Sequence, residues 1–173
     1  MEKLTPQEKI WIGQLDSKEP ATILMAIREI RHHGNIRMLP YLFRLLQPST
    51  HEAVRKSIIM LAGEIKVQDA APVIVDALEH TDMGIDFSQM VAACWQSSLD
   101  FSSYIPVFIK IFVEGDYQTA IEAFSVVEES MINASDAMQK KCIKILDDLA
   151  EEVSQEKYPL FRELVKVVST TLS

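Results

Sequence analysis

The residue types in this chain that could do chemistry are four histidines, two cysteines and a C-terminal group of carboxylates. His32 and His33 are adjacent, so they point to different sides of a helix, and no cysteine or carboxylate cluster accompanies them. The sequence also lacks a glycine-rich phosphate loop and the Cys-x-x-Cys, His-Glu-x-x-His and Gly-x-Ser-x-Gly motifs. We therefore expect no catalytic residue, no metal ion and no cofactor.

Four carboxylates gather near the end of the helix expected over 138–153. A run of acids on one side of a helix is usually a solvated face. A metal site or a site for a basic partner is the alternative. The four residues are Asp147, Asp148, Glu151 and Glu152.

Two arginines and a tyrosine form the best candidate contact patch. Arg37, Tyr41 and Arg44 follow one another at steps of four and three, which places them together on one side of a helix expected over 37–47. Two guanidinium groups beside an aromatic ring suit an acidic peptide. An ordinary solvated face is the alternative.

Charged residues also recur across the chain. Arg44, Asp76 and Lys110 each lie four residues after a proline. Their alternating signs predict ion pairs between neighbouring helices, each contributing about 0–1 kcal/mol when exposed. Together with Arg37 and Tyr41, these three residues are the predicted partner-binding residues.

The element that positions these side chains is a pair of short helices within residues 53–78. Apolar residues from Val54 to Ile65 recur at steps of three and four, which predicts one buried helical face, with Arg55 left in water. A short turn follows, and Asp69 stands where a helix N-cap is expected, three residues before Pro72.

The same pattern returns along the chain. Prolines stand at 40, 72 and 106, at steps of 32 and 34 residues, each at the start of an apolar helix. A single helix pair cannot bury both of its faces, so it needs neighbours of the same kind.

These residues resemble a known family. The Val54-Arg55 start, the Leu61–Ile65 ending and the Asp69–Pro72 entry to the second helix are similar to HEAT repeats. The resemblance implies an all-α fold, a short right-handed αα superhelix of stacked antiparallel helix pairs. It also implies a surface of second helices that faces a partner. HEAT repeats mostly bind other macromolecules and a few are enzymes, so no site residue is carried over.

We expect one repeat domain over residues 1–173. It comprises a cap helix over 5–17, repeats at about 20–48, 51–80, 86–114 and 116–153, and a capping helix over 158–172. Trp11 is expected to cover the first repeat, with an exposed docking role as the alternative. Around Trp95 and Phe108, aromatic side chains are expected to fill a wide gap between repeats, with a partner groove as the alternative.

Composition limits the partners. The net charge is −8, and residues 1–66 hold ten Lys/Arg and seven Asp/Glu, so the remainder is strongly acidic. This balance argues against nucleic acid, which needs neutralised phosphates. We expect no membrane segment and no signal peptide. Cys94 and Cys142 are expected to be reduced core residues, which favours a cytoplasmic location.

The predicted function is a non-catalytic interaction or scaffold module that binds a protein or an acidic peptide through the second helices. An enzyme on a HEAT-like scaffold, such as a lyase-type subunit, is one alternative. A structural subunit that associates with itself is the other.

Overall fold

The computed structural model describes residues 3–170, and every regular element within that range is helical. The all-α class predicted from the sequence is confirmed. The chain divides into two compact units, Met1–Phe87 and Ser88–Ser173, which are taken one at a time below.

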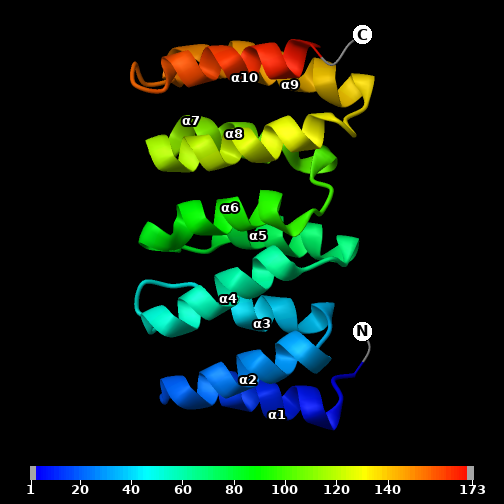
Figure 1. Cartoon of the computed structure of the whole chain (residues 1–173), viewed down its shortest axis with the longest axis vertical. Helices are drawn as coiled ribbons and strands as arrows, with labels where there is room; N and C mark the ends of the chain where they lie inside the picture. The colour runs from blue at the N-terminus through cyan, green and yellow to red at the C-terminus, as the bar shows by residue number, and fades with distance from the viewer. Residues whose placement is uncertain (1–2, 171–173) are drawn as a thin grey trace. The chain divides into compact units, whose positions relative to one another are not determined.

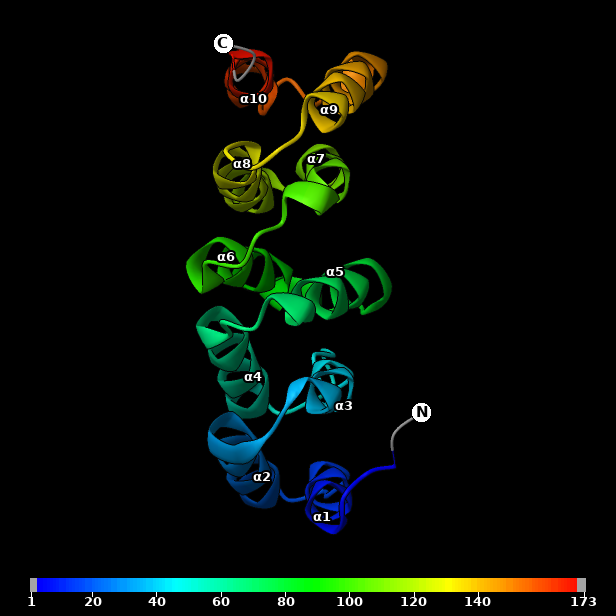
Figure 2. The same ribbon diagram turned by 90° about the vertical axis from the view of Figure 1, so that its right-hand side faces the viewer.

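The first unit is a stack of helix pairs (Figure 1). Helix α1 packs against α2 and α3, α2 packs against α4, and α3 packs against α5. Within this unit α1, α3 and α5 thus form one layer, and α2 and α4 form the other (Figure 2). The elements are α1 (Pro6–Leu15), α2 (Pro20–His33), η1 (Ile36–Met38), α3 (Leu39–Phe43), α4 (Glu52–Glu64), η2 (Gln68–Ala70), α5 (Ala71–His80) and η3 (Gly84–Asp86), where η denotes a 3₁₀ turn.

The second unit repeats this construction. Helix α7 packs closely against α8 and also against α9, and α10 contacts both α8 and α9. The elements are α6 (Phe87–Ser97), which begins at the last residue of the first unit, then η4 (Ser102–Tyr104), α7 (Ile105–Glu114), α8 (Tyr117–Met131), α9 (Asp136–Leu149), η5 (Ala150–Glu152) and α10 (Tyr158–Thr170). The predicted end of the last helix at 172 lies outside the described residues.

Three second helices begin in the same way. Pro40, Pro72 and Pro106 are each the second residue of a helix, and a 3₁₀ turn leads directly into that helix. Proline is tolerated there because the N–H that it lacks would have had no intrahelical acceptor. The proline period of the sequence therefore marks real repeats of one helix pair.

The prediction that Asp69 caps α5 is wrong. Asp69 lies inside η2, and the N-cap of α5 is Ala70, which makes no side-chain cap. The tight backbone turn replaces the carboxylate, since Ala70 N–H donates to the Val67 carbonyl at 3.0 Å. Short turns of this kind are hard to distinguish from a cap in the sequence alone.

Arg55 was expected in water, and this is also wrong. Its side chain is buried, Nε donates to the Asp86 carboxylate, and a terminal N–H donates to the Thr50 carbonyl. Asp86 is itself only 4% exposed. The turn that follows α5 therefore covers the first turns of α4, and the ion pair fastens the two together.

Aromatic side chains fill the core of the second unit. Phe101, Phe108 and Phe112 are fully buried, and the first two rings meet edge-on at 5.4 Å between centroids. Phe112 in turn lies 6.3 Å from Phe161 of α10. Packing, the first of the two interpretations of this aromatic region, is confirmed for these rings. Trp95 is half-buried, and its indole N–H donates to Glu122 at 2.9 Å.

A buried lysine closes the end of α7. Lys157, which is 5% exposed, donates from Nζ to the carbonyls of Phe112 at 3.1 Å, of Val113, and of Gly115 at 2.7 Å. The last carbonyls of a helix have no intrahelical donor, and they carry partial negative charge. Burial lowers the pKa of Lys157, and the nearby Asp116 carboxylate partly opposes that shift.

Candidate protein-binding surface

Two short elements place the predicted contact patch. Asn35 starts η1 by accepting the Arg37 backbone N–H at 2.9 Å, and α3 carries Tyr41 one turn later. Helix α3 ends at Phe43, earlier than expected, and the backbone of Arg44 continues as a turn. The Arg44 guanidinium nevertheless lies over the Tyr41 ring, 5.4 Å from its centroid. A cation over a tyrosine face contributes about 0.5–1 kcal/mol at an exposed site, so the two side chains hold each other in place.

Arg44 is also paired with an acid from another helix. It donates at 2.5 Å to the carboxylate of Asp16, the C-cap residue of α1. The two side chains are 43% and 59% exposed. Exposed pairs contribute only about 0–1 kcal/mol, so the pair between Arg44 and Asp16 is a weak contact.

Arg37 makes a different kind of contact. It donates at 2.8 Å to Glu8, whose side chain is only 1% exposed, and Asn35 donates to the same oxygen at 2.7 Å. The other carboxylate oxygen accepts the backbone N–H of Thr5. The Thr5 N–H, followed by Asn35, holds the pKa of Glu8 below its ordinary value. Arg37 therefore joins α1 to η1 through a buried carboxylate, so its side chain has a structural role and is not simply part of a solvated face.

The sequence contained part of this signal. Thr5 and Glu8 have the spacing of a capping box, and the structure forms both of its hydrogen bonds. The burial of Glu8 was missed, because it depends on Asn35 and Arg37, which lie 27 and 29 residues further along the chain.

The predicted pairing of Arg44 with Asp76 is wrong. Arg44 turns toward Asp16, and Asp76 lies 3.1 Å from Nδ1 of His80 on its own helix. In the second unit, Lys110 lies 3.8 Å from Glu114, also on its own helix. Partners one helical turn away are within easier reach than those on the next repeat. Whether Asp76 and Lys110 contact a partner stays a prediction.

The remaining chemistry-bearing residues are dispersed. His32 and His33 are exposed, and their ring centroids lie 6.2 Å apart. Among the described residues, no three His, Cys, Asp or Glu side chains come close enough to hold a metal ion. Cys94 and Cys142 are buried free thiols, and burial raises the pKa of both, that of Cys142 to about 11. The acidic side chains Asp147, Asp148, Glu151 and Glu152 are exposed.

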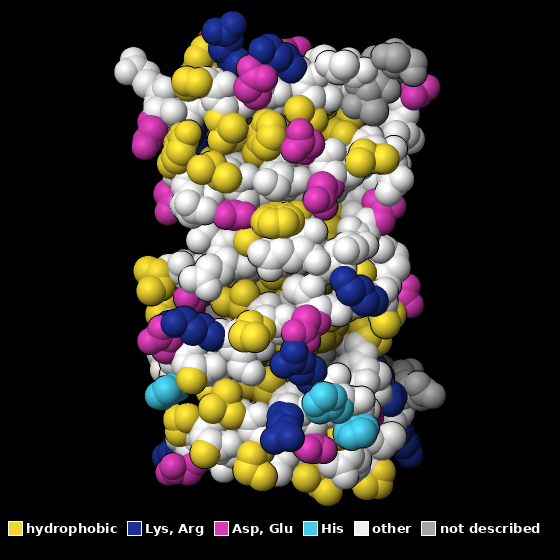
Figure 3. Space-filling model, in the orientation of Figure 1, with side chains coloured by type: hydrophobic (Ala, Val, Ile, Leu, Met, Phe, Trp, Pro, Cys, Tyr) yellow, Lys and Arg dark blue, Asp and Glu magenta, His cyan; other side chains and the backbone are white. Residues whose placement is uncertain are grey.

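The surface is mixed in character. On the face of the first unit shown in Figure 3, basic, acidic and hydrophobic side chains are interspersed.

No helix between residues 3 and 170 has the length and apolar character that crossing a membrane requires.

Stacked pairs of antiparallel helices with a recurring proline define an all-α helical-repeat protein. Residues 9–86 match the family model of HEAT repeats, which covers nearly the whole first unit. The HEAT-repeat family predicted from the sequence is thereby confirmed, on the part of the chain that the model covers. A search of curated proteins found no match to the chain. HEAT repeats commonly mediate protein–protein interaction or scaffolding and are typically non-catalytic.

Proposed function

We propose that this chain is a non-catalytic scaffold module that binds an acidic segment of another protein through the surface of its second helices. The observation that carries the proposal is the Arg44 guanidinium held over Tyr41 and bound to a carboxylate that is itself exposed. Asp16 occupies the place that an acidic side chain of the partner would take.

The rest of the predicted surface belongs to the same proposal. Arg37 is 31% exposed although it is bound to Glu8, so it lends positive charge to the patch. Asp76, on a second helix of the first unit, belongs to the proposed surface, and Lys110 is proposed as a contact residue on a second helix of the second unit. Two buried thiols without a disulfide support a reducing compartment, and we place the protein in the cytoplasm.

The contacts decide which variants test this function. Reversing Arg37 would set two carboxylates against each other around the buried Glu8 and would unfold this end of the chain. Arg44→Glu, combined with Tyr41→Ala, removes the exposed patch and leaves the Glu8 contact intact. Lys56→Glu is a matched control, since Lys56 is an exposed cation paired with Glu52 on the other layer of the unit.

The experiment is affinity capture from a lysate of the source organism. Each captured protein is then titrated against three chains: the wild type, Arg44→Glu/Tyr41→Ala and Lys56→Glu. We expect a partner whose affinity falls at least tenfold with Arg44→Glu/Tyr41→Ala and stays unchanged with Lys56→Glu. Far-ultraviolet circular dichroism verifies that all three chains are folded. Equal affinity for all three chains would reject this surface.

A further inference from the structure

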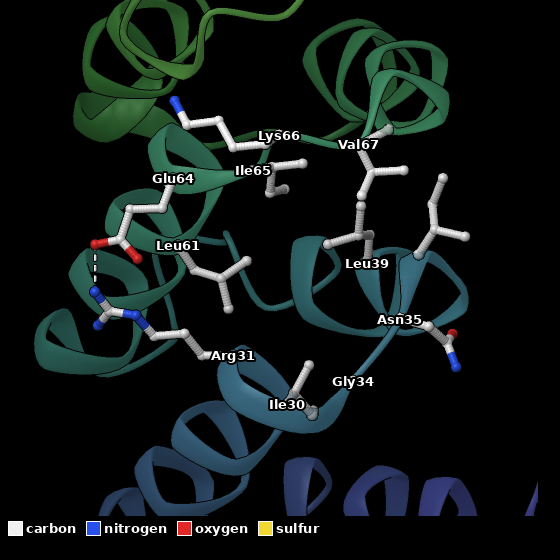
Figure 4. Close-up of a pocket in the computed structure, with 12 residues that line it drawn as sticks. Ile30, Arg31, Gly34, Asn35, Leu39, Leu61, Glu64, Ile65, Lys66 and Val67 are labelled. Atoms are coloured by element: carbon white, nitrogen blue, oxygen red, sulfur yellow. Dashed lines mark hydrogen bonds and ion pairs between the residues drawn. The ribbon is translucent and has the colours of Figure 1, made fainter.

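An apolar pocket of about 230 Å³ opens between two neighbouring repeats of the first unit. It lies where the turn from α2 to α3 meets the turn from α4 to α5. The side chains of Leu39, Leu61, Ile65 and Val67 converge on it (Figure 4). The volume is far above the roughly 10–15 Å³ that one water molecule needs, and the apolar lining offers water few partners. The pocket therefore suits an aliphatic side chain.

The charged lining of this pocket comprises two cations and one carboxylate, so its rim is weakly basic. Arg31 and Lys66 line it, and Glu64 is bound to Arg31, as the dashed line in Figure 4 shows. Arg28 is exposed one turn before Arg31 on α2. Binding of an aliphatic group in this pocket is favoured when carboxylates surround that group.

The second unit carries a turn with the complementary chemistry. Ile132 follows the last residue of α8 and is 79% exposed. Glu128 and Glu129, in the last turn of α8, and Asp136, the first residue of α9, are all exposed. A large aliphatic side chain left in water among carboxylates marks a contact surface.

We propose that the pocket at Val67 receives the Ile132 turn of a second copy of this chain. The aliphatic side chain fills the apolar space, and Glu128, Glu129 and Asp136 face the basic rim. Ile85 is more exposed, at 88%, but the carboxylate next to it, Asp86, is buried against Arg55. Within four residues of Ile85 the one exposed carboxylate is Asp82, so Ile85 offers the rim less negative charge than Ile132, which has three.

The pocket and the turn are different surfaces, so the contact is heterologous, and each copy offers both halves. This contact is separate from the proposed partner surface at Arg44. A failure of one proposal leaves the other standing.

The test is the weight-average molar mass of the full chain, measured by sedimentation equilibrium over a concentration series. For the wild type we expect the mass to rise above the 19.6 kDa of one chain as the concentration increases. Ile132→Lys places a cation against the basic rim, and Val67→Glu places a carboxylate against the acidic turn. Each should weaken association by about 10–100-fold, the effect of burying one aliphatic side chain.

The double variant distinguishes direct contact from indirect effects. In V67E/I132K the new charges are opposite, so association should recover at least tenfold over either single variant. Ile85→Lys is the matched control, and its association should equal that of the wild type. All three altered side chains, Val67, Ile85 and Ile132, are more than 60% exposed in the wild type, so these variants are expected to fold.

A wild-type chain that stays monomeric at every concentration overturns the proposal. Association that Val67→Glu abolishes and Ile132→Lys leaves intact also overturns it, because another occupant would then fill the pocket. Loss in both single variants with recovery in the double variant supports it.

Discussion

At the scale of single residues, buried charged side chains make the most specific structural contacts. Lys157 offers three donors to carbonyls at the end of α7, and these groups lie 42 to 45 residues earlier in the sequence. A lysine is rarely buried without partners of this kind. The contact also joins the turn before α10 to the C-terminal end of α7 within the second unit.

We expect Lys157→Met to lower the free energy of unfolding by about 2–3 kcal/mol, since it removes the ammonium from buried carbonyls and puts no donor in its place. Chemical denaturation monitored by circular dichroism measures the change. Lys166→Met is the control, because Lys166 is exposed in a pair with Glu163, and its effect should stay within about 0.5 kcal/mol. Equal effects of the two substitutions would contradict the capping role.

At the scale of elements, turns decide how neighbouring helices meet. The Arg55–Asp86 pair ties the start of α4 to η3, and Arg55 also binds the carbonyl of Thr50 just before α4. A buried ion pair of this kind stabilises the fold little more than apolar residues in its place would. The loss of one partner, however, leaves the other charge buried without a counter-ion.

Asp86→Leu should therefore lower the free energy of unfolding by about 3–5 kcal/mol, because it leaves the Arg55 guanidinium buried without a counter-ion. Arg55→Met/Asp86→Leu together should cost less than Asp86→Leu alone, since no buried charge remains. Thermal and denaturant unfolding of the single and double variants give the comparison. A double variant that is less stable than the Asp86→Leu chain would be evidence against this account.

At the scale of the whole molecule, we propose that residues 1–173 form one cooperative domain, because each helix pair needs a neighbour to bury its second face. The two tryptophans report on the two units separately. Trp11 lies in the first unit and is 5% exposed, and Trp95 lies in the second.

Trp95→Phe leaves Trp11 as the reporter, and Trp11→Phe leaves Trp95. The indole N–H of Trp11 is buried without an acceptor among the described residues, so Trp11→Phe should cost little. In each variant, we expect the denaturation midpoint from fluorescence to coincide with that from circular dichroism. A fluorescence transition that is displaced from the circular dichroism transition in either chain would instead mean that the units unfold independently.

Much of the architecture was predictable from the sequence. Helix spacing and the proline period identified the helix pairs and several of their boundaries. These signals are local, since they depend on residues within one or two helical turns, and the match to HEAT repeats over residues 9–86 agrees with the family that they indicated.

The candidate site was less predictable. Arg44 and Tyr41 lie together as their spacing implied, but Arg44 binds Asp16 and Arg37 binds the buried Glu8. The burial of Arg55 and Lys157 was missed for the same reason. Periodicity tells which side of a helix is apolar, but the partner of a charged side chain depends on which distant turn lies against it. The sequence by itself therefore determined the helices and their repeat, and only the tertiary structure decided which charges are buried, because those contacts join residues far apart in the chain.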